Sequence, residues 1–264
     1  MKYGSPQPTA KTDSDRPGLA DACRARTRAL HGAAERGGIM RALLRGRVSA
    51  AGYALLLRTL LPAYRVLEYG LRRHRESPGV APLAAFDLAR AAAIEADLVA
   101  LSGPEWRRSL PLLAAGGAYA RRVAKGALGD GRALVANAYV RYLGDLNGGQ
   151  VIATRLSETI GLPQAALNFY RFGDVADLPA LRAAYRAAID AAGREMADPK
   201  FVIEEAAAAF AANIAVSEAV EAALLAATTI PGEESAGSIG RALPIGRQRK
   251  RRSVRRLAIR TPRI

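Results

Sequence analysis

Apolar residues recur at spacings of three and four along most of the chain, which is the spacing of helices with one buried face. The clearest stripe follows Ser49, a residue type that often caps the start of a helix. It consists of Tyr53, Leu56, Leu57, Leu60, Leu61, Tyr64, Leu67 and Leu71. No window alternates with the two-residue period of a half-buried strand. The pattern therefore predicts an all-α fold.

The same periodicity gives the expected extent of each helix. The first runs over 19–36 and ends at two glycines, and the second is the long helix after Ser49, closed by Pro78. A short turn near 39–44 separates them. Further helical patterns cover 86–101, 115–127, 133–146, 150–160, 178–193 and 199–226. Asp198 and Pro199 suit the start of the last helix as cap and first-turn proline.

Composition agrees with the helical pattern and indicates one domain. Half of the 264 residues are hydrophobic but only 6% are aromatic, and alanine, leucine and arginine dominate. That composition favours helices, and the length suits a single domain with a real core. We expect a disordered arm over 1–17, the domain over 18–230 and a disordered basic tail over 231–264.

Positive charge is spread unevenly over these parts. Residues 241–264 contain ten Lys or Arg and no acid, so the tail accounts for about half of the net charge of +15. A tail of this kind could bind nucleic acid or anionic lipid, but it has no interleaved aromatic residues, which favours a solvated extension. The remaining positive charge of the body suits an anionic ligand or an acidic protein partner.

The chain lacks the patterns of a secreted or membrane-spanning protein. Cys23 is the only cysteine, which excludes an internal disulfide. The N-terminal segment has no apolar core of a secretory signal, and no run of 18 residues is apolar throughout. We expect a cytoplasmic monomer without a membrane span.

One face of the first helix combines basic residues with a titratable side chain. Arg24, Arg28, His31 and Glu35 follow helical spacing, so they share that face. Spacing alone fits a solvated charged face better than a metal site. In the functional alternative, His31 binds a metal, Glu35 orients its other ring nitrogen, and the arginines bind carboxylates. The other histidine, His74, lies at a charged helix end and is expected to face solvent.

A single histidine restricts which metal group is possible. A zinc site takes three or four protein ligands, whereas haem brings four nitrogen ligands of its own. If His31 binds a metal, haem iron is therefore the economical choice. Cys23 lies eight residues earlier, about 12 Å along the helix, so both cannot bind one iron. We interpret Cys23 as a small core residue.

The stretch AYVRYLGDLNGGQ, residues 138–150, places three glycines within a helical pattern. Each glycine costs about 1 kcal/mol relative to alanine inside a helix. Gly144, Gly148 and Gly149 lie near Asp145 in this stretch. Bare backbone there would admit a flat, wide ligand, or it would permit close packing of a second helix. The sequence leaves these two alternatives equally open.

At this point several segments resemble the haem oxygenase family. RYLGDLNGGQ is similar to the family's signature, which usually has serine where Asn147 stands. TRALHGAAERGGIMRALLRGR resembles the segment with the proximal histidine, and AAFAANIAVSEAV resembles the last core helix. The similarity spans about residues 19–228. It implies a single-domain, multi-helix fold in which haem b lies between a proximal and a distal helix.

The resemblance also implies roles for individual residues. His31 would be the axial ligand with Glu35 as its partner, and Asp145 would organise water near bound oxygen. Gly144 and Gly148 would contact haem. The distal hydrogen-bond network would include Arg141, Tyr64 and Asn213. Propionates would lie near the hydroxyl of Tyr139 and a basic cluster of Arg24, Arg28, Arg182 and Arg186. Arginine replaces the family's more usual lysine at several of these positions, which changes the hydrogen-bond geometry that orients haem.

The implied activity is oxidative cleavage of haem at a meso carbon to biliverdin, CO and ferrous iron, with O2 and external electrons. No Rossmann or flavin motif is present, so a ferredoxin or a reductase would supply the electrons. The chain lacks the hydrophobic anchor of some members, as soluble bacterial members do. Two alternatives remain: a haem sensor or carrier that uses the same His31 pocket without catalysis, and a nucleic-acid binder that uses the basic tail.

Overall fold

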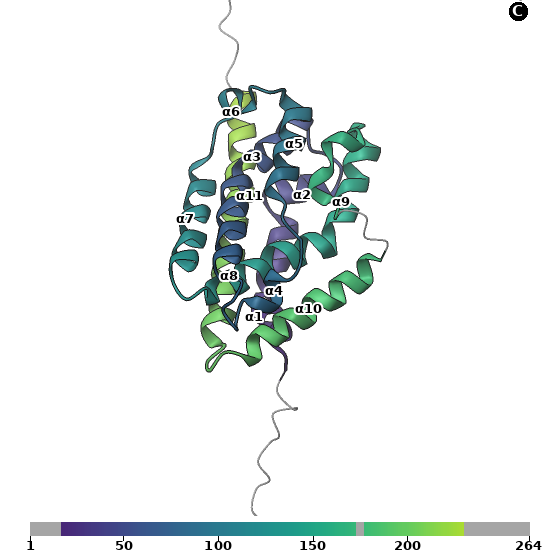
Figure 1. Cartoon of the computed structure of the whole chain (residues 1–264). Helices are drawn as coiled ribbons and strands as arrows, with labels where there is room; N and C mark the ends of the chain where they lie inside the picture. The colour runs from purple at the N-terminus through teal and green to yellow at the C-terminus, as the bar shows by residue number, and fades with distance from the viewer. Residues whose placement is uncertain (1–16, 173–176, 230–264) are drawn as a thin grey trace, which may run out of the picture. The chain divides into compact units, whose positions relative to one another are not determined.

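The computed structural model describes residues 17–172 and 177–229, and within them it contains helices and no strand (Figure 1). Residues 1–16 of the arm expected over 1–17 lie outside the described residues, as does the whole tail expected over 231–264. The α-helices are α1 (Leu19–Arg36), α2 (Gly38–Leu44), α3 (Ala50–Arg73), α4 (Ala81–Ala84), α5 (Ala91–Ser102), α6 (Trp106–Ser109), α7 (Ala114–Leu128), α8 (Arg132–Ala138), α9 (Gly144–Ile160), α10 (Leu178–Arg194) and α11 (Lys200–Thr229). A π-helical turn, η2 (Tyr139–Leu143), joins α8 to α9, and two 3₁₀ turns follow, η3 (Gln164–Ala166) and η4 (Asn168–Tyr170).

Two long helices, α3 and α11, organise the packing of the others. Helix α11 packs against α1, α2, α3, α7 and α8, while α3 packs chiefly against α5 and α7 (Figure 1). All eight residues of the predicted apolar stripe on α3 are buried. The side chain of Ser49 accepts a hydrogen bond from the Gly52 amide at 3.1 Å, so the predicted helix cap is confirmed.

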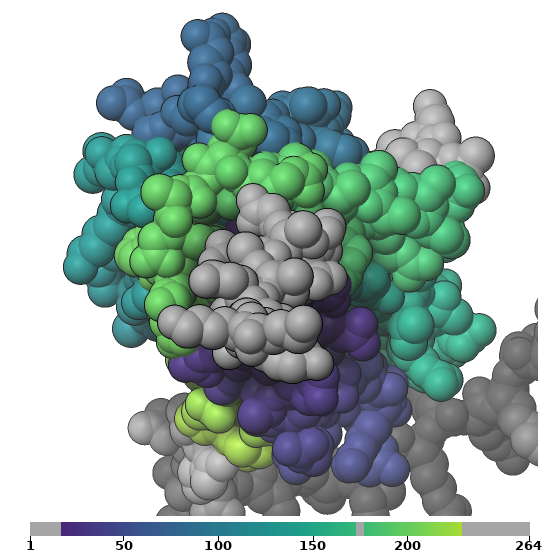
Figure 2. Space-filling model, turned by 90° about the horizontal axis from the view of Figure 1, so that it is seen from below, coloured from purple at the N-terminus to yellow at the C-terminus, as the bar shows by residue number. Residues whose placement is uncertain are grey.

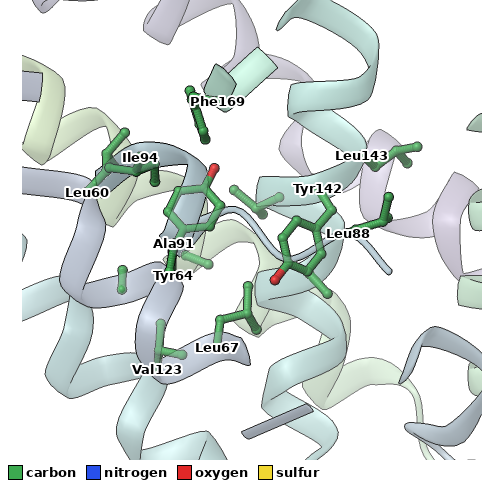
Figure 3. Packing of buried hydrophobic residues seen from close by; sticks show 14 of the residues in the cluster. Leu60, Tyr64, Leu67, Leu88, Ala91, Ile94, Val123, Tyr142, Leu143 and Phe169 are labelled. Atoms are coloured by element: carbon green, nitrogen blue, oxygen red, sulfur yellow. The ribbon is translucent and has the colours of Figure 1, made fainter. Parts of the chain in front are cut away.

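A buried carboxylate on α5 fixes the segment that follows α9. Asp97 is fully buried and accepts hydrogen bonds from the amides of Asn168 and Phe169, both at 2.8 Å. These bonds satisfy the start of η4, which would otherwise leave buried donors unpaired. The aromatic ring of Phe169 then meets Tyr64 edge to face at a centroid distance of 5.4 Å (Figure 3). In this way η4 supports the buried face of α3.

Helix α11 is long and apolar enough, by length and composition, to cross a membrane. A window of 18 residues within Lys200–Thr228 has a mean hydropathy of 1.5, although we expected no span. Length and composition do not by themselves distinguish a span from a helix packed in a folded body. The acidic side chains of α11 pair with the body: Glu204 with Arg26, and Glu205 with Arg122. These contacts fit a helix that belongs to the folded bundle.

The structure differs from the predicted helices in two places. The expected turn near 39–44 is the two-turn helix α2. The expected break between 146 and 150 is absent, because helical backbone continues through the glycines from residue 132 to 160. The irregularity lies earlier, at η2, where one turn is widened. π-Helical turns are rare, and those that occur often lie at functional sites.

Candidate functional site

His31 lies on an exposed face of α1, with one ring nitrogen free among the described residues. Its side chain is 62% exposed, and Nδ1 lies 3.2 Å from Oε1 of Glu35 one turn later. The ring also contacts Phe210 of α11 at a centroid distance of 5.4 Å. A carboxylate beside Nδ1 favours a proton on that nitrogen, which leaves the Nε2 lone pair available to a metal.

A buried hydrogen-bond network connects α3, the continuous segment of η2 and α9 (139–160, called the distal helix below) and α11. The guanidinium of Arg141 donates to the Tyr64 hydroxyl through Nε at 2.8 Å and Nη2 at 2.6 Å. Nη2 also lies 3.1 Å from Oδ1 of Asp145, and Tyr64 donates its own proton to Oδ2 of Asp145. Nη1 donates to the side-chain oxygen of Asn213. The four residues therefore act as one unit, since each shares a partner with another.

Burial controls the protonation of this network. It raises the pKa of Asp145, against the opposing effects of the Arg141 charge and the hydrogen bond from Tyr64. Burial also raises the pKa of Tyr64 well above its usual range, so the phenol keeps its proton. The network thus contains a carboxyl group that takes up a proton more readily than an exposed aspartate does.

The Tyr64 ring is fixed by aromatic neighbours from two other segments. Phe169 of η4 lies against one edge, and Tyr142 of η2 lies at a centroid distance of 6.2 Å (Figure 3). Leu60, Leu67 and Leu88 surround the same cluster (Figure 3). Because the ring is held on several sides, its hydroxyl has a fixed direction toward Asp145.

The three glycines of the distal helix separate into two kinds. A Cβ at Gly149 would lie 2.7 Å from Cδ1 of Tyr170, so this glycine allows the distal helix to pack on η4. Cβ atoms at Gly144 and Gly148 would meet nothing within 4 Å. Both alternatives for the glycine stretch are therefore present in the same helix. Gly149 serves packing because Tyr170 covers it, whereas Gly144 and Gly148 leave the backbone open.

The residues of the predicted basic cluster lie on α1, α10 and η2. Arg24 and Arg28 are exposed on α1, while Arg182 and Arg186 are half-buried on α10. Tyr139 is half-buried in η2, and burial raises the pKa of its phenol against the opposing effect of a side-chain hydrogen bond with Thr27. Arg186 forms an ion pair with Asp21 of α1, a residue that the sequence analysis did not single out.

His74 is not solvent-facing as expected. Its Nε2 donates a hydrogen bond at 2.9 Å to the Ala127 carbonyl at the end of α7, and the ring packs beside Gly131. The flanking arginines are exposed, but helical spacing turns His74 toward the neighbouring helix end. Cys23 is fully buried, so its interpretation as a core residue is confirmed.

Sequence reasoning also missed the buried carboxylate Glu68 on α3. Its Oε1 accepts from the amides of Arg90 and Ala91 at 2.6 and 2.7 Å and so caps α5 from a different helix. The only signal was an acid beside an otherwise apolar stripe. Such a residue needs a partner, but the sequence does not indicate that a distant helix start provides it.

Glu68 also lines a surface groove of about 290 Å³ among α3, α4 and α10. No residue of the predicted site lines this groove, although Tyr142 of η2 does. Tyr185 lines it too, and its buried hydroxyl has no hydrogen-bond partner among the described residues. The groove is thus separate from the face that contains Gly144 and Gly148.

Comparison with known proteins decides the family. The family model described as heme oxygenase matches residues 17–219. The chain belongs to the haem oxygenase family. Among curated haem oxygenases, the chain is 34% identical to "Heme oxygenase 1" of Homo sapiens over 219 residues, covering 82% of this chain and 75% of the human protein. It is 31% identical to "Heme oxygenase 1" of Nostoc sp. over 210 residues, covering 79% and 88% respectively.

Solved haem oxygenase structures share the fold. Heme oxygenase-1 of the cyanobacterium Synechocystis sp., solved in complex with heme, superposes with a TM-score of 0.73 at 30% identity, covering 81% of this chain and 97% of that one. The heme oxygenase of Leptospira interrogans gives a TM-score of 0.72 at 26% identity, covering 76% and 99%. The all-α haem oxygenase fold is therefore confirmed, as is membership of a family of haem-degrading oxygenases.

Proposed function

We propose that this haem oxygenase cleaves haem at a meso carbon to biliverdin, CO and ferrous iron, using O2 and external electrons. The observation that carries the proposal is the buried network of Arg141, Tyr64 and Asp145 beside the open backbone at Gly144 and Gly148. A protein that only stores or senses haem has no need of a buried acid that takes up a proton. The network therefore favours catalysis over the sensor or carrier alternative.

Haem b fits the residues present on both faces of the proposed site. His31 has an exposed ring with Nε2 available and Glu35 beside Nδ1, which suits an axial ligand. Gly144 and Gly148 offer backbone that a flat macrocycle can approach, since no side chain covers it. Arg24, Arg28, Arg182 and Arg186, with Tyr139, supply donors for two propionates. When bound, the haem iron supplies the activation of O2.

The protein's part in the reaction is to position protons. Both oxygens of Asp145 are engaged, Oδ1 by Arg141 and Oδ2 by Tyr64. Asp145 therefore acts through an ordered water rather than by direct contact, which is within the reach of general acid catalysis. Asn213 fixes the outer edge of the Arg141 guanidinium, and Arg141 in turn fixes the Tyr64 hydroxyl. These contacts keep the acid at one place.

The choice of meso carbon follows from how the porphyrin is held. Backbone at Gly144 and Gly148 would limit the approach of O2 to one edge of the ring, and the arginine cluster would set the rotation of the ring. Because Arg182 and Arg186 lie on α10 while Arg24 and Arg28 lie on α1, the propionates would be gripped from two helices.

The proposed partners follow from charge and from the chemistry required. Electrons would come from a ferredoxin or a reductase, and the net positive charge of residues 1–230 suits an acidic donor. We also propose that the protein is a cytoplasmic monomer. Binding of nucleic acid by residues 241–264 is a separate alternative that concerns residues outside the described structure.

Product analysis after a single turnover tests the proposed function. Purified protein is titrated with haemin, and the complex is reduced in the presence of O2 by ferredoxin with its reductase. We expect a Soret band on binding, then its loss with formation of one biliverdin isomer and one equivalent of CO. A stable oxygen complex without biliverdin would support the sensor or carrier alternative instead.

A further inference from the structure

The ion pair between Asp21 and Arg186 joins α1 to α10 at the proposed propionate site. Nη2 of Arg186 contacts Oδ1 of Asp21, and the two side chains are 33% and 55% exposed. Figure 2 shows the green surface of α10 beside the purple surface of α1 at this end of the molecule. Both side chains of the pair are therefore partly exposed to solvent.

Arg186 differs from the other three arginines of the cluster. Among the described residues, no ion pair joins Arg24, Arg28 or Arg182 to a protein carboxylate, whereas Arg186 has one with Asp21. Arg24 and Arg28 are exposed, and Arg182 is half-buried without an ion pair. Arg186 is both half-buried and paired, so it is the most firmly placed guanidinium of the four. A carboxylate ligand would therefore meet an arginine that already has a carboxylate partner.

Asp21 lies in the first turn of α1, where a carboxylate favours the helix N-terminus, so its pairing with Arg186 is a second role beside that one. Asp190 of α10 is also near Arg186, but it accepts a hydrogen bond at 2.8 Å from the Ala20 amide and so caps the start of α1. No hydrogen bond or ion pair links Asp21 to any described residue except Arg186. The strong hydrogen bond from Arg186 lowers the pKa of Asp21, so Asp21 is ionised at neutral pH.

We propose that Asp21 is a specificity-determining residue that competes with a propionate of the substrate for the guanidinium of Arg186. The inference rests on the proposed function, because it assumes a porphyrin dicarboxylate at the arginine cluster. The competition weakens binding of any ligand with a carboxylate at this position, and it speeds exchange of a dicarboxylate product such as biliverdin. A porphyrin without free carboxylates gains nothing when Asp21 is neutralised.

The size of the effect follows from the exposure of the pair. Exposed ion pairs are weak, so we expect neutralising Asp21 to tighten carboxylate binding by about two- to fivefold. Most of the change should lie in the dissociation rate, because mutations within one binding site change the dissociation rate more than the association rate.

The experiment compares Asp21→Asn with a matched control, Glu204→Gln. Glu204 forms the other ion pair between α1 and a neighbouring helix, with Arg26, so both variants remove one exposed negative charge paired to this part of the molecule. Affinity is measured for haemin by Soret titration and for iron-free protoporphyrin IX by fluorescence. Each porphyrin is also tested as its dimethyl ester.

Asp21→Asn should raise the affinity for both free acids two- to fivefold and leave the affinity for both esters unchanged. Glu204→Gln should change none of these affinities. Adding Arg186→Gln to Asp21→Asn should abolish the gain. Equal gains in the two single variants, or an equal gain with the esters, would overturn the proposal. If both porphyrins bind but haemin shows no Soret signature of iron ligation, the proposed function fails while the competition is still measured. If no porphyrin binds, both fail.

Discussion

Tyr64 and Asp145 share a hydrogen bond that joins the middle of α3 to the first turn of α9. The phenol donates to Oδ2 of Asp145, and the same phenol oxygen accepts from Arg141. A change at Tyr64 therefore alters the acid even though Tyr64 does not lie on the distal helix. This coupling makes the proposed site sensitive to substitutions in α3.

Asp145→Asn should leave haemin affinity within about twofold and lower biliverdin formation by about a hundredfold, because the acid is lost while the shape is kept. Single-turnover product analysis measures both quantities on the same sample. The control is Asp97→Asn, which removes another buried carboxylate outside the site. If both variants lose product per bound haem equally, the effect is one of stability and Asp145 has no chemical role.

Asp145 should also affect how stability depends on pH. Its pKa is raised in the fold, so the folded protein binds more protons than the unfolded chain above the ordinary aspartate value. The free energy of unfolding contributed by Asp145 is then present at low pH and is lost as pH rises through the raised pKa. Urea titrations between pH 4 and 8 should show wild type losing stability relative to Asp145→Asn as pH rises. A difference that grows in the opposite direction would contradict the sign of the shift.

His31→Ala should weaken haemin binding by about tenfold or more and stop turnover, since no other histidine lies on that face and the arginines there cannot ligate iron. Added imidazole should restore the Soret band and part of the activity. His74→Ala is the natural control, because His74 is the only other histidine and bonds to Ala127 instead. Loss of the Soret band in both variants, without rescue, would remove His31 as the ligand.

Alanine at the two adjacent glycines should have opposite effects on the free protein. Gly148→Ala should raise stability by about 0.5–1 kcal/mol, because its Cβ would enter open space in a helix interior. Gly149→Ala should lower it by about 1–3 kcal/mol, because Tyr170 must move. Thermal melts without ligand measure both. Gly148→Ala should also weaken haemin binding, and unchanged affinity would place the ligand elsewhere.

The single thiol should report unfolding. Burial raises the pKa of Cys23 to about 12, and the side chain is fully buried. At pH 8 its reaction with a disulfide reagent should be slower by about a thousandfold than that of an exposed thiol, because the thiolate fraction is smaller by that factor. The rate should rise to the ordinary value in denaturant. Rapid labelling of the native protein would mean that α1 opens readily from α10 and α11.

The helices near the site were predictable because the apolar spacing on α3 and the cap at Ser49 are local signals. Whether such a helix forms depends on residues within one or two turns of each position. The same holds for Arg24, His31 and Glu35, whose common face follows from helix geometry. The family resemblance then assigned roles that spacing alone left open.

Contacts between segments distant in sequence were not predictable in the same way. Nothing near Gly149 indicates that Tyr170 will cover it, and nothing near Glu68 indicates that it will cap α5. The ion pair of Asp21 with Arg186 joins residues 165 positions apart. The expectation that His74 faces solvent was wrong for the same reason, since its partner is a carbonyl at the end of another helix.

The widened turn at Tyr139–Leu143 carries one more residue than an α-helical turn would. Excising a single position within this turn would restore ordinary winding and keep the downstream residues near their present angle, whereas excising one from α8 would swing everything downstream by about 100° around the axis. Asp145 would then lose its hydrogen bond with the Tyr64 phenol, and the open backbone at Gly148 would face a different direction. The spacing between the two halves of this helix is therefore a quantity that insertions and deletions change but ordinary substitutions do not.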